Sequence, residues 1–337
     1  MRRQGYAGTR EYDSPRFLYG DIAKGHVGNR EEEDDMKLGV STYSFVRDLA
    51  SGKRSVEDVI RWVGEHGGEH VEIVPFGFTV RDNPSLIKRI RQTADEAGVE
   101  LSNYLILSNF TLTDDAAYRK EIDRVRQEVD VAVELGVRLM RHDVAWKPRQ
   151  EGEEAGLAGR LWPMQAIAIE RFEESLPRMA AASAEIADYA NQFGITTMVE
   201  NHLFLVQASD RVQRLIQTVD RTNFRTTLDI GNFLCVDESP VVGVAKNLSY
   251  AKMVHLKDFY VRPSSADPGE GWFRSAYGTY LRGAIFGHGD IDVREVFRTM
   301  KAQAYAGYAS LEFEGMEDPE LGVRLGLANA KRLWDEV

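Results

Sequence analysis

The sequence predicts an α/β protein built as a single (β/α)8 TIM barrel. Short apolar runs alternate with longer amphipathic segments along most of the 337 residues. Eight such runs can be counted, which is the strand number of a closed parallel barrel. A doubly wound open sheet, the alternative fold, normally carries a glycine-rich phosphate loop after its first strand, and none follows the first run here. The eight predicted strands span 38–45, 70–75, 100–107, 137–143, 195–201, 224–230, 252–258 and 308–313.

Helix-start and helix-stop residues separate these runs. Ser55 opens a capping box before an amphipathic segment. Asn83 is followed by Pro84, a cap residue with proline at the first helical position, and Gly98 closes that helix. Further helices are predicted to begin at Asp115, Ser209 and Asp292, and the last is predicted from about Leu321 to Trp334.

Three segments depart from the alternation of strands and helices. Residues 1–36 are rich in Gly, Arg and acidic residues and bury little apolar surface, so we expect a flexible N-terminal tail before a barrel of residues 37–337. Long connections follow the fourth and seventh strands, over 144–168 and 259–291. Both leave the carboxyl ends of strands, where barrel enzymes carry their binding loops, so we expect them to form walls or lids of a substrate pocket.

Composition excludes several classes of protein. A net charge of −11 argues against nucleic acid as a partner. No apolar run approaches the length of about 20 residues that a membrane span needs. No hydrophobic stretch follows the first residues, and Cys235 is the single cysteine, which fits a reducing compartment. A cytoplasmic location is therefore expected.

Four consecutive predicted strands end in a carboxylate or an imidazole. Because strand ends of a barrel open at one mouth, these side chains are expected at the same height. Three carboxylates alone would repel one another, and one divalent cation would remove that repulsion. The set suits Mn²⁺ as first choice, or Mg²⁺, Co²⁺ or Zn²⁺. The alternative is that each residue caps a helix or pairs with a neighbouring Lys or Arg. The four residues are Glu200, Asp229, His255 and Glu312.

Five short motifs make the chain resemble the xylose isomerase-like TIM barrels, which include sugar phosphate isomerases and epimerases and AP-endonuclease-type enzymes. The resemblance covers about residues 37–335 and implies the same four metal ligands, with Glu314 sharing the parity of Glu312. DNA-repair members carry extra histidines on strands two, three and six, whereas here strands two and three end without a histidine and Asn232 stands three residues after Asp229. The motifs lie at 199–202, 228–232, 254–258, 286–292 and 311–315.

The resemblance implies a metal-dependent sugar isomerase or epimerase. In such enzymes the metal polarises a carbonyl and an adjacent hydroxyl, so that the proton on the carbon between them becomes acidic and an enediolate forms on the metal. By this analogy Glu200 and Glu312 are the catalytic acid–base pair and work from opposite faces of the substrate.

His202 offers a second reaction class. It lies two residues beyond Glu200, so it points into the same mouth if the strand continues, and an imidazole is a good base near neutral pH. The Glu-x-His arrangement resembles the metal-bearing subunit of C-glycoside deglycosidases, which are lyases. That resemblance implies β-elimination on a 3-oxo-glycoside with His202 as base, and a small partner subunit. A structural hydrogen bond is the simpler reading of His202, and a non-catalytic sugar-binding barrel is the remaining alternative.

A small-molecule carbohydrate is the expected partner, and a homo-oligomer is possible on the pattern of such barrels. Polar and aromatic side chains near the predicted mouth are candidates for contacting that carbohydrate. His142 and Asp143 end the fourth strand, Lys257 shares the parity of His255, and the indoles offer faces for a sugar ring. The predicted substrate-binding residues are His142, Asp143, Lys257, Trp146, Trp272 and His288.

Overall fold

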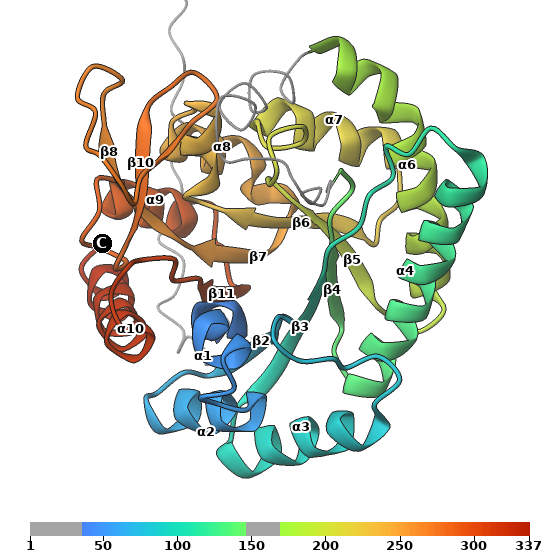
Figure 1. Cartoon of the computed structure of the whole chain (residues 1–337), viewed down its shortest axis with the longest axis horizontal. Helices are drawn as coiled ribbons and strands as arrows, with labels where there is room; N and C mark the ends of the chain where they lie inside the picture. Colours follow the sequence, from blue (N-terminus) through green and yellow to red (C-terminus); the bar gives the residue numbers. More distant parts are fainter. Residues whose placement is uncertain (1–35, 146–168) are drawn as a thin grey trace, which may run out of the picture. The chain divides into compact units, whose positions relative to one another are not determined.

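Eight parallel strands close into a barrel in the order β1-β11-β7-β6-β5-β4-β3-β2 (Figure 1). The computed structural model describes residues 36–145 and 169–337. The predicted fold class is confirmed, and each predicted strand overlaps an observed one. The barrel strands are β1 (Lys37–Ser41), β2 (His70–Ile73), β3 (Glu100–Ile106), β4 (Leu139–His142), β5 (Thr196–Glu200), β6 (Phe224–Asp229), β7 (Ala251–Leu256) and β11 (Tyr308–Leu311).

Helices surround the barrel (Figure 1), and those whose starts were predicted from the sequence begin at or close to the predicted residues. Ser55 and Asp58 form the predicted capping box, Asn83 caps the helix that starts at Pro84, and Asp292 caps α9. None of the helices in the described ranges is both long and apolar enough to cross a membrane. The helices are α1 (Val46–Ala50), α2 (Val56–Glu65), α3 (Pro84–Ala97), α4 (Asp115–Leu135), α6 (Ile169–Asn191), α7 (Ser209–Val219), α8 (Pro240–Asn247), α9 (Val293–Ala302) and α10 (Pro319–Asp335), with 3₁₀ turns η2 (Thr42–Phe45), η3 (Asn232–Val236) and η4 (Leu248–Tyr250).

The barrel interior is apolar at the amino end of the strands and polar above it. Leu139, Met198 and Met253 form a small core of their own, with Tyr308 packed against it. Alternate residues along a strand face the same side, so the next inward positions lie above this layer. Arg141 and Glu200 follow on β4 and β5 two residues further along the same strands, and both are buried. An apolar layer of side chains therefore lies beneath the polar residues at the carboxyl ends of the strands.

The predicted long connection after β7 folds into a small antiparallel sheet of its own. Strands β8 (Asp258–Arg262), β9 (Phe273–Arg274) and β10 (Tyr280–Ala284) pair in the order β8-β10-β9. The Asp258 carboxylate accepts hydrogen bonds at 2.9 Å from the backbone N–H groups of Gly287 and Gly289. A Cβ at Gly289 would lie 2.1 Å from Asp258 Oδ1, so this turn can approach the carboxylate only through a glycine.

Two of the predicted segments fall largely outside the described residues. The tail predicted at 1–36 lies there except for its last residue, and so does most of the connection predicted at 144–168. Trp146 belongs to this second segment. The boundary at residue 37 coincides with the first residue of β1.

Candidate metal centre

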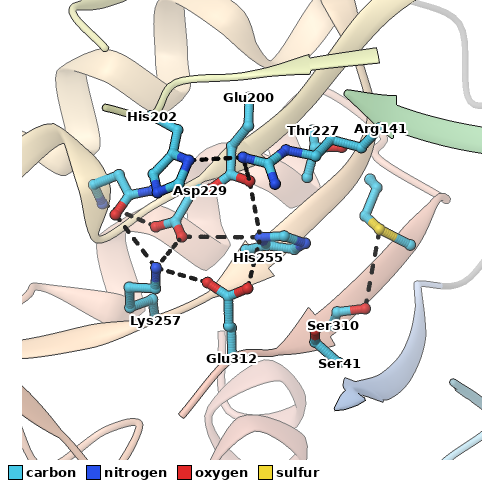
Figure 2. Close-up of polar contacts among 12 residues, drawn as sticks. Ser41, Arg141, Glu200, His202, Thr227, Asp229, His255, Lys257, Ser310 and Glu312 are labelled. Carbon is cyan, nitrogen blue, oxygen red and sulfur yellow. Dashed lines mark hydrogen bonds and ion pairs between the residues drawn. The ribbon is translucent and has the colours of Figure 1, made fainter. Parts of the chain in front are cut away.

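The four predicted metal ligands meet at the carboxyl end of the barrel (Figure 2). Glu200 and Asp229 are the last residues of β5 and β6, His255 lies on β7, and Glu312 follows β11. Asp229 pairs in register with His255, so neighbouring strands bring these two side chains to one level. One ligand atom from each of the four residues lies within 4.8 Å of all the others. All four are buried, none with more than 6% of its surface exposed.

Glu72 on β2 fixes the orientation of the His255 ring. Glu72 Oε2 lies 3.0 Å from His255 Nε2, and both side chains are fully buried. Asn103 donates a hydrogen bond of 2.6 Å to the other Glu72 oxygen. When Nε2–H donates to Glu72, the lone pair of Nδ1 faces the cluster. His255 Nδ1 lies 3.6 Å from a Glu312 oxygen and 3.7 Å from a Glu200 oxygen. The imidazole thus presents a ligand nitrogen to the carboxylates.

Glu200 is held by a cation and an amide. Arg141 Nη2 lies 2.9 Å from Glu200 Oε2, and Asn232 Nδ2 donates to Glu200 Oε1 at 2.8 Å. Burial acts to raise the pKa of Glu200, but Arg141 and His255 outweigh it and hold this pKa well below the usual range. Glu200 therefore stays ionised, as a metal ligand must.

Lys257 bridges the other two carboxylates of the cluster. Its Nζ lies 2.6 Å from Glu312 Oε2 and 3.0 Å from Asp229 Oδ2 (Figure 2). Burial, together with the nearby charges of Glu200 and Asp229, raises the pKa of Glu312 to about 6. The other oxygen of Asp229 accepts hydrogen bonds of 2.8 Å from the backbone N–H groups of Gly231 and Asn232. Asp229 is therefore anchored through Oδ1 and directs Oδ2 at the cluster.

The buried charges of this cluster fit a divalent cation. Together with Glu72, the three ligand carboxylates place four buried negative groups beside two buried cations, Arg141 and Lys257. His255 Nδ1 is buried and makes no hydrogen bond to any residue in the described parts of the chain. A divalent ion would balance the excess negative charge and take up this nitrogen. Three oxygen donors and one nitrogen donor suit Mn²⁺, Mg²⁺, Co²⁺ or Zn²⁺.

His202 lies at the side of the cluster. Its Nδ1 is 3.3 Å from Asp143 Oδ1 and 2.8 Å from Arg141 Nη2, and its side chain is 30% exposed. Burial acts to lower the pKa of His202, but the Asp143 carboxylate outweighs it and the pKa is raised. Asp143, predicted to bind substrate, is buried and paired with Arg141 at 2.7 Å. Within the described residues, Asp143 contacts Arg141 and His202 and does not line the cavity that opens above the cluster.

A cavity of about 350 Å³ opens above the cluster. Tyr43 and Phe76 form an edge-to-face pair on its wall, with ring centres 5.6 Å apart. Both polar and apolar side chains line this cavity, which is typical of a small-molecule site. Its lining comprises Tyr43, Val74, Phe76, Leu105, Leu107, Arg141, Glu200, His202, Leu203, Lys257, Glu312 and Glu314.

His142 points away from this cavity. The imidazole is fully buried, and its ring centre lies 5.7 Å from that of Phe110 and 6.1 Å from that of Phe224. Strand β4 therefore turns Arg141 inward and His142 outward, although the sequence predicted the histidine as the substrate contact. Burial lowers the pKa of His142 to about 4, so the ring is neutral where it packs.

Two further predicted substrate contacts lie in the segment after β7. Arg262 and Arg282 lie over the Trp272 ring at 5.6 and 5.2 Å from its centre. His288 is exposed in the turn after β10. Within residues 36–145 and 169–337, neither side chain lines the cavity above the cluster. Their role, like that of Trp146, stays a prediction.

Glu72 and Arg141 are the two functional candidates that sequence reasoning did not select. Each is a charged residue inside a short strand, and that placement is the signal by which both can be recognised. A buried charge is costly unless it is paired, so a charged residue inside a barrel strand points to a partner across the barrel.

Replacement of Glu72 by alanine is expected to weaken Mn²⁺ binding about 10- to 100-fold, because His255 loses the acceptor that orients its ring. Glu72→Gln is expected to lose less, since its amide oxygen still accepts from Nε2–H. Isothermal titration calorimetry measures both affinities, with Met253→Leu as a control for changes inside the barrel. Wild-type affinity in Glu72→Ala would show that Glu72 does not position the ligand.

Fold and site together define a TIM-barrel protein with a candidate divalent-metal centre at its mouth. The chain belongs to the family of xylose isomerase-like TIM barrels, whose family model matches residues 60–333. The predicted family is confirmed.

Curated relatives with sequence similarity are named as dehydratases. Inosose dehydratase of Bacillus licheniformis is 26% identical over 165 residues, which are 48% of this chain and 54% of that protein. Inosose dehydratase of Halalkalibacterium halodurans is 27% identical over 140 residues, 40% of this chain and 44% of that protein. The chain therefore spans about half the length of the curated relatives it matches.

Solved structures of similar fold include epimerases and a dehydratase. D-psicose 3-epimerase in the presence of D-fructose has a TM-score of 0.64 at 15% identity, over 89% of this chain and 99% of that one. Apo 3-keto-D-glucoside 4-epimerase from E. coli has a TM-score of 0.63 at 13% identity, over 88% of this chain and 100% of that one. The probable 3-DHS dehydratase from Bacillus anthracis has a TM-score of 0.63 at 17% identity, over 88% of this chain and 98% of that one. At these identities the likeness shows the shared fold.

Proposed function

We propose that this protein is a divalent-metal-dependent sugar isomerase or epimerase that removes a proton from a carbon next to a carbonyl. The observation that carries the proposal is the convergence of Glu200, Asp229, His255 and Glu312 below a cavity that both glutamates line. The proposal agrees with a family whose relatives modify sugars, among them the epimerases of similar fold.

The four residues would hold the metal, with Mn²⁺ as the proposed ion. When bound, a divalent ion supplies the Lewis acidity that makes a proton next to a carbonyl acidic. Epimerisation needs one group that takes this proton and another that returns a proton to the opposite face of the carbon. Glu312, with a pKa of about 6, and Glu200, on a different strand, are the proposed pair.

Lys257 would stabilise the negative charge that develops on the substrate. Its ammonium lines the cavity and already lies 2.6 Å from Glu312 Oε2. Nearby carboxylates outweigh the effect of burial and hold the pKa of Lys257 well above its usual value, so the side chain stays charged. A fixed cation next to the reacting carbons lowers the energy of an enediolate without reorganisation.

The first test is uptake of deuterium from D₂O into a panel of ketoses and 3-oxo-glycosides, with added Mn²⁺ and with a chelator. Exchange that requires the metal would support proton abstraction, and the product separates the classes: an epimer or isomer from an isomerase, a released leaving group from a lyase. Metal binding without exchange on any sugar would contradict the proposal and favour a sugar-binding barrel.

A β-eliminating lyase is the second candidate, and the position of His202 favours it. In elimination the base takes the proton next to the carbonyl, the bond from the β-carbon to the leaving group breaks, and that group leaves with a proton. From its position two residues beyond Glu200, His202 is predicted to be the base. Because Asp143 raises the pKa of His202, we assign the histidine to protonation of the leaving group instead. The relatives named as dehydratases remove water, which is chemistry of this kind.

His202→Gln separates the two classes. In a lyase the variant is expected to keep proton exchange while it releases the leaving group at least about 100-fold more slowly, because general-acid catalysis typically contributes that much. In an isomerase there is no leaving group, and the rate of proton exchange should stay near the wild-type value. His66→Gln, which changes an exposed histidine at the end of α2, is the control. Loss of exchange together with release would contradict the acid role and return His202 to the role of base.

The homo-oligomer or small partner subunit that the sequence suggests stays a prediction, as do the cytoplasmic location and the absence of nucleic-acid binding. Size-exclusion chromatography with light scattering measures the oligomeric state directly. A single chain that is active as a monomer would argue against a required partner.

A further inference from the structure

The small β8-β10-β9 sheet has one apolar face and one charged face. Residues that lie directly opposite each other in paired strands share a face. On the apolar face, Phe259 and Leu281 are buried together with Cys235 of η3. This packing attaches the sheet, which stands outside the ring of barrel strands (Figure 1). The opposite, charged face is left partly open to solvent, with Tyr260 and Arg282 only half-buried.

Arginines and aromatic rings alternate across the charged face. Tyr260 lies opposite Arg282 in the pairing of β8 with β10. Tyr280 lies opposite Arg262 on one side and Arg274 on the other. The guanidinium group of Arg282 is 4.8 Å from the centre of the Tyr260 ring, and that of Arg274 is 4.3 Å from the centre of the Tyr280 ring. Because cation–π contacts hold these guanidinium groups, they are already ordered before any partner binds.

Two of the three arginines lack a carboxylate partner. Arg262 forms an ion pair of 3.2 Å with Asp290. Neither Arg274 nor Arg282 has a carboxylate oxygen within 4.0 Å anywhere in residues 36–145 and 169–337. The buried Nε of Arg282 also has no hydrogen-bond acceptor there. These two unpaired arginines can therefore accept a carboxylate from another molecule.

The connection between β8 and β9 carries two unpaired carboxylates. Asp267 and Glu270 are exposed in this connection, and in the described parts of the chain no Lys, Arg or His nitrogen lies within 4.0 Å of them. One short excursion thus presents two unpaired cations and two unpaired anions. Such a patch is self-complementary, because a twofold axis sets the cations of one copy against the anions of the other.

Aromatic surface accompanies these charges. Tyr277, in the turn between β9 and β10, is 70% exposed, and Trp272 is half-buried beside the arginines. Arg, Tyr and Trp are the side chains enriched at the centres of protein interfaces. A nucleic acid or an anionic membrane would bring phosphates against Asp267 and Glu270, whereas a second copy of the chain satisfies charges of both signs.

We propose that two copies of this chain associate about a twofold axis through the charged face of the β8-β10-β9 sheet. The two unpaired arginines of each copy lie against the two unpaired carboxylates of the other, and the aromatic side chains supply apolar contact between them. This inference does not rest on the proposed function, since none of the candidate metal ligands belongs to this face.

The test measures the molecular mass in solution by sedimentation equilibrium over a range of concentrations. The wild type is expected to be a dimer. Arg274→Glu with Arg282→Glu, and Asp267→Arg with Glu270→Arg, are each expected to weaken dimerisation at least about 100-fold, because like charges then face each other. An equimolar mixture of the two double variants is expected to recover a dimer, because the reversed charges of one then meet those of the other.

Lys88→Glu with Lys120→Glu is the matched control. Both lysines are exposed, on α3 and α4, and the double variant changes the net charge by as much as the arginine variant does. It should stay dimeric. A monomeric wild type, a dimer that persists in the two interface variants, or a mixture that stays monomeric would each overturn the proposal. Circular dichroism verifies folding, and the carboxylate variant, which changes only exposed loop residues, decides alone if the arginine variant is unfolded.

Discussion

Separate Glu200→Gln and Glu312→Gln variants are expected to lose at least about 100-fold of the metal-dependent exchange rate, because each removes a group that moves the substrate proton. The amide keeps the size and a ligand oxygen but cannot take up or release a proton at neutral pH. The rate is measured at saturating Mn²⁺, with the metal affinity of each variant determined by calorimetry. A loss that persists at saturation then belongs to the chemical step.

Glu100→Gln is the matched control for this pair, since Glu100 is exposed at the start of β3, at the opposite end of the barrel. Glu314→Gln tests which of the two glutamates that follow β11, Glu312 or Glu314, moves the substrate proton. Glu314 Oε1 lies 3.2 Å from Lys257 Nζ and shares the inward parity of Glu312. Full activity in both Glu200→Gln and Glu312→Gln would exclude the proposed pair, and loss in Glu314→Gln alone would move the role to that residue.

Arg141→Met is expected to lower the free energy of unfolding of the metal-free protein by about 3–5 kcal/mol, the typical cost of leaving one side of a buried ion pair without its partner. Arg141 is 2% exposed and lies 2.7 Å from Asp143 and 2.9 Å from Glu200. Its removal leaves both carboxylates buried without their shared cation. Urea unfolding monitored by circular dichroism measures the loss.

Saturating Mn²⁺ should restore part of this stability, because a bound cation would neutralise Glu200 while Asp143 would keep only His202 as a partner. Arg221→Met is the control. Arg221 forms an exposed ion pair with Asp188 at 2.6 Å, and pairs of this kind contribute at most about 1 kcal/mol. Equal losses of stability in Arg141→Met and Arg221→Met would contradict the role of Arg141 as the buried counter-charge of the site.

The candidate metal ligands could be predicted because each lies within one residue of the end of a strand. Glu200 and Asp229 are the last residues of β5 and β6, and Glu312 is the first residue after β11. Parallel strands of a barrel end at the same mouth, so strand position alone predicts that these side chains gather. Their burial and their separation within 4.8 Å agree with that prediction.

The partners of these ligands could not be predicted in the same way. Arg141, His142 and Asp143 follow one another at the end of β4. Because polar residues then occur on both faces of the strand, the residue pattern does not indicate which face points into the barrel. The structure turns Arg141 towards Glu200 and His142 towards Phe110. Inward direction depends on how β4 pairs with β3 and β5, which is a property of the closed sheet.

By itself, the sequence determined the strand count, the helix caps and the strand-end residues of the candidate centre, because these follow from local periodicity and from residue types that act within a few positions. Tertiary structure decided that Glu72, far from His255 in sequence, orients its ring, and that the segment after β7 forms the β8-β10-β9 sheet. Barrel closure brings strands β2 and β7 face to face, and only that closure places a carboxylate of one against the imidazole of the other.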